Sequence, residues 1–211
     1  MIEEPAAERL VRHLAHRGIR DPRVLAAIRD VPRQAFVPGN CARDAWLDEA
    51  LPLGSGQTVS QPYVVALMTE ALELEASSKV LEVGTGSGYQ AAVISRIAPQ
   101  VFTIEILPVL AESACERLAR LGYCTVRCRQ GDGAEGWPEE APFEAIVVTA
   151  APKRVPQALV DQLAVGGRLC VPVGEDPSDQ RLLLFVKRPD GGLDGHALAP
   201  VRFVPMTGAA P

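Results

Sequence analysis

The sequence predicts an α/β protein of one domain: a mostly parallel sheet with helices on both faces, helices at the N-terminus and antiparallel edge strands at the C-terminus. Three observations lead to this fold class. The length of 211 residues suits one well-cored domain. From residue 79 to residue 173, short apolar runs alternate with segments of helical periodicity. A glycine-rich turn joins the first of these runs to the helix after it.

The N-terminal third is predicted to be helical around one long loop. Apolar residues recur at helical spacing in residues 3–17, and again after a helix start signal at Pro22. Residues 31–61 are rich in proline and glycine and show no sustained period, so we expect a long loop with a few ordered turns. A third helix with one apolar side is expected to begin at Pro62.

The alternating region supplies the predicted sheet. Strands are expected at residues 79–83, 101–105, 125–129, 143–149 and 167–173, and helices at 89–98, 108–121 and 155–163. The chain then changes character, with strand-like runs at 181–187 and 198–204 around the turn-rich residues 189–192. These runs are expected to add antiparallel strands at the edge of the sheet.

Composition and charge disfavour several classes of protein. A net charge of −5 gives no broad positive field, so we expect no nucleic-acid partner. The N-terminus lacks a basic and apolar leader, and no apolar run is long enough to span a bilayer, which predicts a cytoplasmic protein without a membrane contact. The five cysteines are scattered without a CxxC pair, which favours reduced thiols and no metal site.

Three loops are predicted to meet at one edge of the sheet. Residues 84–88 read Gly-Thr-Gly-Ser-Gly after the first strand, where glycines let a ligand approach the backbone, although tight packing alone can also require them. Glu105 ends the next strand, where a carboxylate either accepts hydrogen bonds from a ribose or lies exposed to solvent. Residues 131–133 form a Gly-Asp-Gly turn after the third strand. Together they favour a nucleotide site at the carboxyl ends of the strands.

A nicotinamide-dependent enzyme is the alternative at this point. Such an enzyme needs a proton donor or acceptor beside the hydride transfer. The histidines are His13, His16 and His196, and none of them falls in a predicted ligand loop. The residues outside the nucleotide pocket therefore have to distinguish the two classes.

Several segments of the chain resemble one enzyme family. The run GQTVSQPYVVALM at residues 56–68 closely resembles the signature of bacterial protein-L-isoaspartate O-methyltransferases. The same resemblance extends to DPRVL (21–25), FVP (36–38), VLEVGTGSGYQ (80–90), GDGAEGW (131–137), GGRL (166–169) and PVRFVPMTG (200–208). It covers nearly the whole chain in the family's order, with Trp46 and Glu144 as mild departures from residues that many relatives carry.

The resemblance implies a fold, an activity and partners. It implies a single Rossmann-like methyltransferase domain over residues 1–211, with 1–78 as the N-terminal helical and active-site segment, 79–175 as the cofactor-binding core and 176–211 as the C-terminal edge strands. The implied enzyme transfers a methyl group from S-adenosyl-L-methionine to the free carboxylate of L-isoaspartyl residues in damaged proteins and peptides, leaving S-adenosyl-L-homocysteine. We expect it to act as a monomer.

The resemblance also implies site residues. Ser60 takes the place of the active-site serine of the family. The implied cofactor contacts are Gln57, Thr58, Val59, Ser60, Glu82, Gly84, Gly86, Ser87, Gly88, Glu105, Asp132, Gly133 and Thr207.

The reaction suits a segment that contains no histidine. The acceptor carboxylate has an ordinary pKa near ~4 and is ionised at neutral pH, so no general base is needed. Ser60 is therefore not expected to be a nucleophile, because a serine nucleophile needs an adjacent base. It precedes a predicted helix start, where free N–H groups attract an anion. The alternative is that Ser60 only caps the helix, which is worth about 1 kcal/mol.

Two further functions stay open as alternatives. A methyltransferase of the same fold that acts on a small molecule would leave GQTVSQP unexplained. A protein that binds S-adenosylmethionine as a sensor would be favoured if the Ser60 segment were missing, and it is present. Trp46 and Tyr63 lie in or next to the long loop, where they shape a peptide groove or pack in the core.

Overall fold

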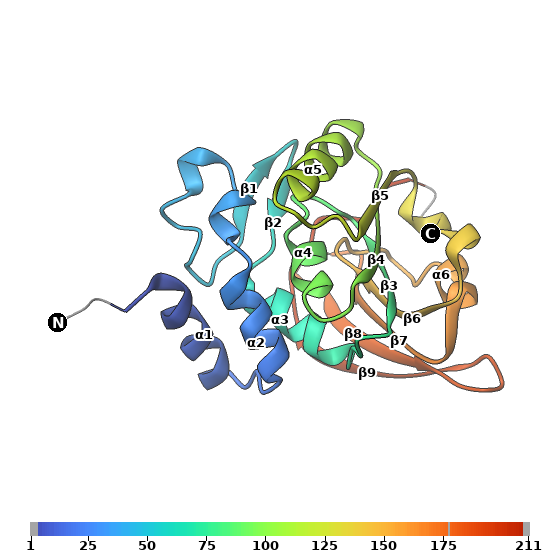
Figure 1. The fold of residues 1–211 in the computed structure, drawn as a ribbon. Helices are drawn as coiled ribbons and strands as arrows, with labels where there is room; N and C mark the ends of the chain where they lie inside the picture. The colour runs from blue at the N-terminus through green and yellow to red at the C-terminus, as the bar shows by residue number, and fades with distance from the viewer. Residues whose placement is uncertain (1–3, 177, 209–211) are drawn as a thin grey trace.

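The computed structural model describes residues 4–176 and 178–208. These residues form a seven-stranded sheet in the order β5-β4-β3-β6-β7-β8-β9 and a separate two-stranded sheet, β1-β2 (Figure 1). The strands are β1 (Leu51–Gly54), β2 (Gln57–Val59), β3 (Lys79–Val83), β4 (Gln100–Glu105), β5 (Val126–Gln130), β6 (Phe143–Val148), β7 (Leu163–Val173), β8 (Arg181–Lys187) and β9 (Leu193–Pro200). The α-helices are α1 (Ala6–His16), α2 (Pro22–Asp30), α3 (Pro62–Ala71), α4 (Tyr89–Ser95), α5 (Pro108–Arg120) and α6 (Gln157–Gln162).

The sheet confirms the predicted α/β class. Strands β3 to β7 pair in parallel, and β8 and β9 add antiparallel strands at one edge. Strand β3 pairs with β4 on one side and with β6 on the other, so the direction of winding changes beside β3. In open α/β sheets, ligands bind outside the carboxyl ends of the strands at such a switch point. The fold therefore places a ligand crevice at the ends of β3, β4 and β6.

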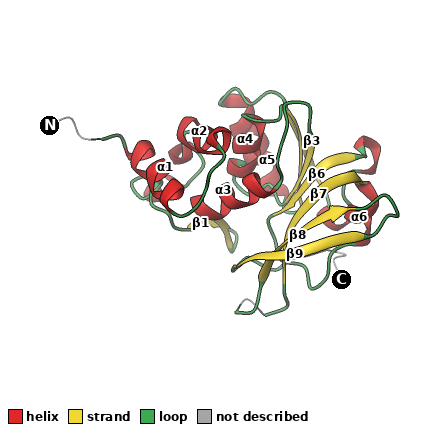
Figure 2. Cartoon of the chain, turned by 90° about the horizontal axis from the view of Figure 1, so that it is seen from below, coloured by secondary structure: helices red, strands yellow, loops and turns green. Residues whose placement is uncertain are grey.

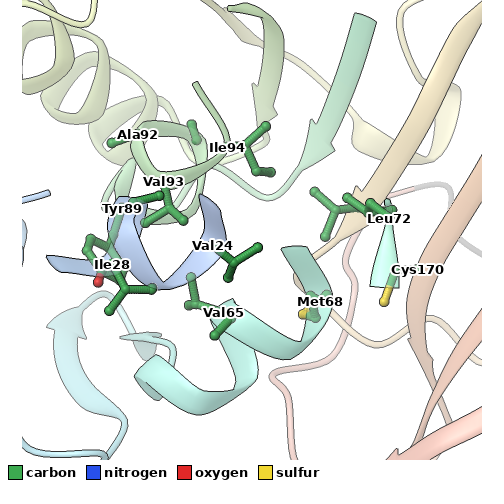
Figure 3. Packing of buried hydrophobic residues seen from close by; sticks show 14 of the residues in the cluster. Val24, Ile28, Val65, Met68, Leu72, Tyr89, Ala92, Val93, Ile94 and Cys170 are labelled. Atoms are coloured by element: carbon green, nitrogen blue, oxygen red, sulfur yellow. The ribbon is translucent and has the colours of Figure 1, made fainter. Parts of the chain in front are cut away.

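Two hydrophobic clusters cover the two faces of the sheet. Because side chains alternate along a strand, Val80 of β3 belongs to one cluster, and Leu81 and Val83 belong to the other. Helices α1 to α5 lie on the first face and α6 on the second (Figure 2). On the first face, apolar residues of α2, α3 and α4 pack together, with Ile28 and Tyr89 close to each other (Figure 3).

The prediction for the last strand is wrong in position. A strand was expected at residues 198–204, and β9 instead runs from Leu193 to Pro200. Its start is fixed by pairing, since Leu193 lies opposite Lys187 directly after the turn at 189–192. Strand β9 is at the edge of the sheet and mostly exposed, so its sequence lacks the apolar pattern that marks buried strands.

The long segment 31–61 is more ordered than the sequence predicted. It contains the 3-10 turns at Arg33–Ala35 and Gly39–Cys41 and the hairpin of β1 and β2. The turn of this hairpin has Ser55 at a φ of 52° and Gly56 at 72°, the left-handed conformations that suit a tight hairpin turn. The hairpin ends one residue before Ser60, so it fixes the entry to α3.

Two features bear on the environment of the chain. None of the helices within residues 4–176 and 178–208 is long and apolar enough to cross a membrane. All five cysteines are free thiols, of which Cys41 and Cys170 are buried and Cys124 is exposed.

Candidate functional site

A cavity of about 590 Å³ opens at the carboxyl ends of β3, β4 and β6. Most of its wall comes from three parts of the chain. These are residues within 57–67 from β2 and α3, residues within 82–90 and 104–107 around the ends of β3 and β4, and residues 199–207 from the C-terminal segment. Such a volume suits a small-molecule ligand, and its location is the switch point of the sheet.

Glycine is sterically required in two of the loops. Gly84 has a φ of 97°, and the hydroxyl of Thr149 donates a hydrogen bond to its carbonyl oxygen at 2.6 Å. A Cβ on Gly84 would overlap that hydroxyl, and a Cβ on Gly133 would overlap the side chain of Val83. The close approach that these glycines allow keeps both loops against the end of the sheet and leaves the cavity open.

Glu105 lies at the end of β4 and holds the glycine loop. Its carboxylate accepts hydrogen bonds from the N–H of Gly86 at 2.8 Å and from the N–H of Leu107 at 3.1 Å. The residue is 6% exposed and lines the cavity, so the alternative of a solvent-exposed glutamate is wrong. Since each carboxylate oxygen has a second lone pair, Glu105 can accept further hydrogen bonds from ligand hydroxyls.

Glu82 lies in β3 on the face that packs against α4, and it is fully buried. Its Oε2 accepts a 2.5 Å hydrogen bond from the hydroxyl of Thr103, which in turn contacts the hydroxyl of Thr85 at 2.6 Å. Within the described residues its Oε1 has no partner. Burial raises the pKa of Glu82 to about 8, the charge of Glu105 adds to the rise and the Thr103 hydrogen bond opposes it.

The structure places Ser60 between the end of β2 and the start of α3, half-buried on the cavity wall. Helix α3 has Gln61 as its N-cap and Pro62 in its first turn, so the alternative that Ser60 caps the helix is wrong. The shift has a physical reason: proline favours the first helical position and pushes the residue before it out of the helical conformation. Gln61 has the extended ψ of 135° that this predicts.

The sequence led us to expect free N–H groups at the start of α3 that could bind an acceptor anion. The structure shows that the N-terminus of α3 already binds a carboxylate of the protein. The carboxylate of Asp48 accepts the N–H of Tyr63 at 2.8 Å. Arg17 and His13, from the end of α1, lie 2.5 and 3.3 Å from the same carboxylate. The guanidinium of Arg17 stacks on the ring of Tyr63, 3.5 Å from its centroid. Asp48 therefore joins α1 to the start of α3 beside the cavity.

A buried arginine fixes the backbone at Ser60. Arg33 is fully buried and donates hydrogen bonds to the carbonyl oxygens of Ala45 at 2.6 Å, Ser60 at 2.9 Å and Glu49 at 3.1 Å. Desolvation lowers the pKa of this guanidinium. Arg33 thus ties three turns of the segment before α3 into one unit that presents Ser60.

The C-terminal segment forms a further part of the wall. After β9 the chain runs beside the loop that follows β6, where the N–H of Ala151 donates to Val204 and the N–H of Met206 donates to Ala151, each at 2.8 Å. This pairing brings Val201, Phe203 and Thr207 to the cavity. Sequence reasoning identified Thr207 by resemblance but gave no role to residues 199–206.

Eleven of the predicted cofactor residues line this cavity, and two do not. Those that line it are Gln57, Thr58, Val59, Ser60, Glu82, Gly84, Gly86, Ser87, Glu105, Gly133 and Thr207. Gly88 lies behind it against Leu118, at the start of α4. Asp132 accepts the N–H of Ala134 and so caps the short turn after β5. Gly88 and Asp132 thus support loops whose other residues reach the cavity, and do not reach it themselves.

Several residues that the sequence did not single out also line the cavity. Ile106 and Leu107 follow Glu105 and give an apolar surface, and Tyr63 contributes its ring, whereas Trp46 packs against the core and does not line the cavity. Arg17 lines it as well. No sequence pattern marks Arg17, because its partners Asp48 and Tyr63 are distant in the chain. Within residues 4–176 and 178–208, no cluster of three His, Cys, Asp or Glu side chains is placed to hold a metal ion.

Comparison with known proteins gives the family of the chain. The model of the protein-L-isoaspartate(D-aspartate) O-methyltransferase family matches residues 5–210. A protein-L-isoaspartate O-methyltransferase of Gloeobacter violaceus is 53% identical over 198 residues, covering 94% of this chain and 96% of its own length. Protein-L-isoaspartate O-methyltransferase 1 of Anaeromyxobacter sp. is 53% identical over the full length of both chains.

Solved structures agree with this result. A protein-L-isoaspartate O-methyltransferase structure superposes with a TM-score of 0.87 at 32% identity, over 97% of this chain and 67% of that one. A structure described as a beta-aspartate methyltransferase from Plasmodium falciparum, in complex with S-adenosyl-L-homocysteine, gives a TM-score of 0.81 at 25% identity, over 97% of this chain and 99% of that one. With a family match over nearly all of its length and relatives more than half identical to it, the chain belongs to the protein-L-isoaspartate(D-aspartate) O-methyltransferase family.

Proposed function

We propose that the chain transfers the methyl group of S-adenosyl-L-methionine to the free carboxylate of L-isoaspartyl residues in damaged proteins and peptides. We propose further that it does so as a monomer in the cytoplasm. The observation that carries the proposal is that Ser60 and Glu105 line one cavity in a member of this family. Its partners are then isoaspartyl proteins and peptides, with no nucleic acid or membrane among them.

The half of the cavity at the sheet fits the cofactor. Glu105 provides a carboxylate for the ribose hydroxyls, and Ile106 and Leu107 provide an apolar surface beside it for the adenine. The backbone around Gly84 and Gly86 lies close enough to the cavity for direct contact with a ligand. Gln57, Thr58 and Thr207 also line the cavity, where they are available to the remainder of the cofactor.

The half of the cavity at α3 fits the acceptor. In the described part of the chain, the Ser60 hydroxyl has no hydrogen-bond partner, so it is available to donate to a bound carboxylate. Its backbone is held by Arg33, which limits how far the hydroxyl can move. Tyr63 and residues 201–203 line the same cavity, where a bound peptide would contact them.

Alignment is the main contribution that these residues make. When bound, S-adenosyl-L-methionine supplies a methyl group whose bond to a positively charged sulfur breaks as the bond to the carboxylate oxygen forms. The acceptor carboxylate is ionised at neutral pH, so no protein group has to remove a proton. Positioning of the two reactants can supply on the order of 7 to 11 kcal/mol in ideal cases. Ser60 orients the acceptor oxygen, and the loops at Gly84 and Glu105 fix the cofactor.

Matched peptides test the proposal directly. The chain is incubated with methyl-labelled S-adenosyl-L-methionine and with two peptides that differ only in carrying L-isoaspartate or L-aspartate at one position. We expect base-labile label on the isoaspartyl peptide alone, because methyl esters hydrolyse in base. Equal labelling of both peptides, or labelling of neither, would refute the proposal.

The role of Ser60 is tested by Ser60→Ala. The variant should lower kcat for the isoaspartyl peptide by about 10-fold or more, since one hydrogen bond to a charged group is worth about 1.5 to 3 kcal/mol. Its free energy of unfolding should stay close to that of the parent, because Ser60 does not cap α3. Ser113→Ala on α5, outside the cavity, is the control. Unchanged kcat at an equal folded fraction would remove Ser60 from the site.

A further inference from the structure

The charges on the cavity wall are unevenly distributed. Four of its lining residues are charged: Glu82, Glu105, Arg17 and Arg202. Both acids lie at the sheet end and are almost fully buried, and Glu105 is already engaged by backbone N–H groups. Both arginines expose their side chains, Arg17 beside Tyr63 on α3 and Arg202 on the C-terminal segment. The charged side chains that the cavity wall exposes are therefore both positive, although the net charge of the chain is −5.

Arg202 is held on a rigid support. The residue before it, Val201, donates its N–H to the carbonyl oxygen of Gln180 at 3.1 Å. The buried side chain of Gln180 contacts both backbone groups of Phe203, accepting the N–H at 2.6 Å and donating to the carbonyl oxygen at 3.1 Å. Phe203 is buried in the core while Arg202 is exposed. Asp176 lies close enough to interact electrostatically with Arg202. Within the described residues the Arg202 guanidinium makes no hydrogen bond, so its N–H donors are available to a ligand.

Arg17 is held from two sides. Its guanidinium lies flat on the Tyr63 ring, and one of its terminal nitrogens contacts Asp48 at 2.5 Å. A guanidinium carries five N–H donors, so this contact leaves others for a ligand. The side chain is 38% exposed and lines the cavity on the same side as Ser60.

We propose that Arg202 and Arg17 are specificity-determining residues that favour isoaspartyl residues with an acidic side chain within two positions in the peptide. The inference rests on the proposed function and adds a substrate class to it. With the isoaspartyl carboxylate at Ser60, an extended peptide advances at most about 3.3 to 3.6 Å per residue, so side chains one or two positions away remain near the cavity mouth. Aspartate and glutamate are the side chains whose carboxylates match the planar donors of a guanidinium.

Flanking charge in the substrate is the first test. One isoaspartyl peptide is made with Glu, Gln or Lys at each of the two positions on either side, and kcat/KM is measured at low and at high salt. We expect the Glu peptide to exceed the Lys peptide by about 2- to 5-fold at low salt at one or more of these positions, which is the upper part of the range for an exposed ion pair. The ratio should shrink towards one in high salt, because the Debye length falls to about 3 Å at 1 M.

Charge reversal at the protein is the second test. Arg202→Glu should invert the preference so that the Lys peptide becomes the better substrate, while Arg202→Gln and Arg17→Gln should each weaken it. Arg181→Gln is the matched control, since Arg181 is exposed and adjacent to Gln180 but does not line the cavity. Equal kcat/KM for all peptides in the parent chain, or a preference that Arg202→Glu leaves unchanged, would overturn the inference. If no peptide were methylated at all, the proposed function would fail instead.

Discussion

Single residues in this site show how burial changes the chemistry of a side chain. The resemblance to the family implies that Glu82 contacts the cofactor. In the structure it is fully buried in β3 and accepts a hydrogen bond from the hydroxyl of Thr103. With a pKa of about 8 it holds a proton at neutral pH. A neutral carboxylic acid can donate as well as accept, so Glu82 can join the hydroxyls of Thr103 and Thr85 without placing a second negative charge next to Glu105.

Glu82→Gln should therefore change how stability depends on pH. The pKa of Glu82 is raised in the folded state above its ordinary value of 4.5, so its contribution to stability is fully present below about pH 4.5 and is lost as the pH rises through about 8. The glutamine variant cannot ionise, and its free energy of unfolding should improve relative to the parent as the pH rises from 5 to 9. Chemical denaturation at a series of pH values measures the difference. Parallel curves for the two proteins would show that Glu82 ionises normally.

At the scale of elements, one carboxylate bridges the end of α1 and the start of α3. Asp48 takes the N–H of Tyr63 at the start of α3 and pairs with Arg17 at the end of α1. Neither helix supplies an N-cap side chain of its own. The orientation of α3 relative to Ser60 thus depends on Asp48, a residue from the segment between α2 and α3.

Asp48→Ala should loosen this junction. The loss of a side-chain acceptor at a helix start costs about 0.5 to 2 kcal/mol. The pairing of the largely buried Asp48 with the part-exposed Arg17 adds about 1 kcal/mol or less. We expect a decrease of this size in the free energy of unfolding, measured by urea denaturation. KM for the isoaspartyl peptide should rise as well, since Arg17 and Tyr63 lose a common partner. Asp44→Ala, an exposed neighbour in the same segment, serves as the control, and an equal effect of both substitutions would argue against the junction.

The elements differ in how far the sequence could predict them. Strand β3 and the loop to α4 were predictable, because a buried parallel strand is a continuous apolar run and the loop is dense in glycine. The hairpin of β1 and β2 was not, since each strand is short and half-exposed; only the Ser55-Gly56 pair at its turn hinted at it. Strand β9 was misplaced for a similar reason, as an exposed edge strand has no apolar pattern.

The site was predictable to a similar degree. Ser60, Glu105 and the glycines follow from local motifs and from the resemblance, because each belongs to a contiguous run of sequence. Arg17, Arg33 and Arg202 did not follow, since their positions come from tertiary contacts. Arg33 reaches Ser60 from another turn of the chain, and the backbone beside Arg202 is held by Gln180, just before the start of β8. No local pattern contains such contacts.

At the scale of the whole molecule, the cavity lies where the direction of winding of the sheet changes, beside β3. Glu105 links the sheet to the cavity, because it ends β4, accepts a hydrogen bond from the N–H of Gly86 and lines the cavity. A ligand that binds only the folded chain raises its stability by about 2.7 kcal/mol at a concentration of 100 times its Kd. The thermal stability of the chain is therefore expected to report on cofactor affinity.

Glu105→Ala should weaken both quantities. The variant loses the acceptor proposed for the ribose hydroxyls and the support of the glycine loop. We therefore expect the Kd for S-adenosyl-L-homocysteine to rise by at least about 10-fold, or 1.4 kcal/mol. Titration calorimetry measures the affinity, and the ligand-induced rise in Tm should shrink in parallel. Glu112→Ala, exposed on α5, is the control. An unchanged Kd would contradict the role given to Glu105.

The walls of the cavity come from opposite ends of the described chain, with Arg17 at the end of α1 and Thr207 after β9. During synthesis, the strands up to β7 can assemble while the last segment is still inside the ribosome. The nucleotide crevice gains its second wall only when residues 199–207 emerge and fold back beside Ala151. Chains that lack residues 199–207 are therefore expected to hold the proposed methyl donor poorly.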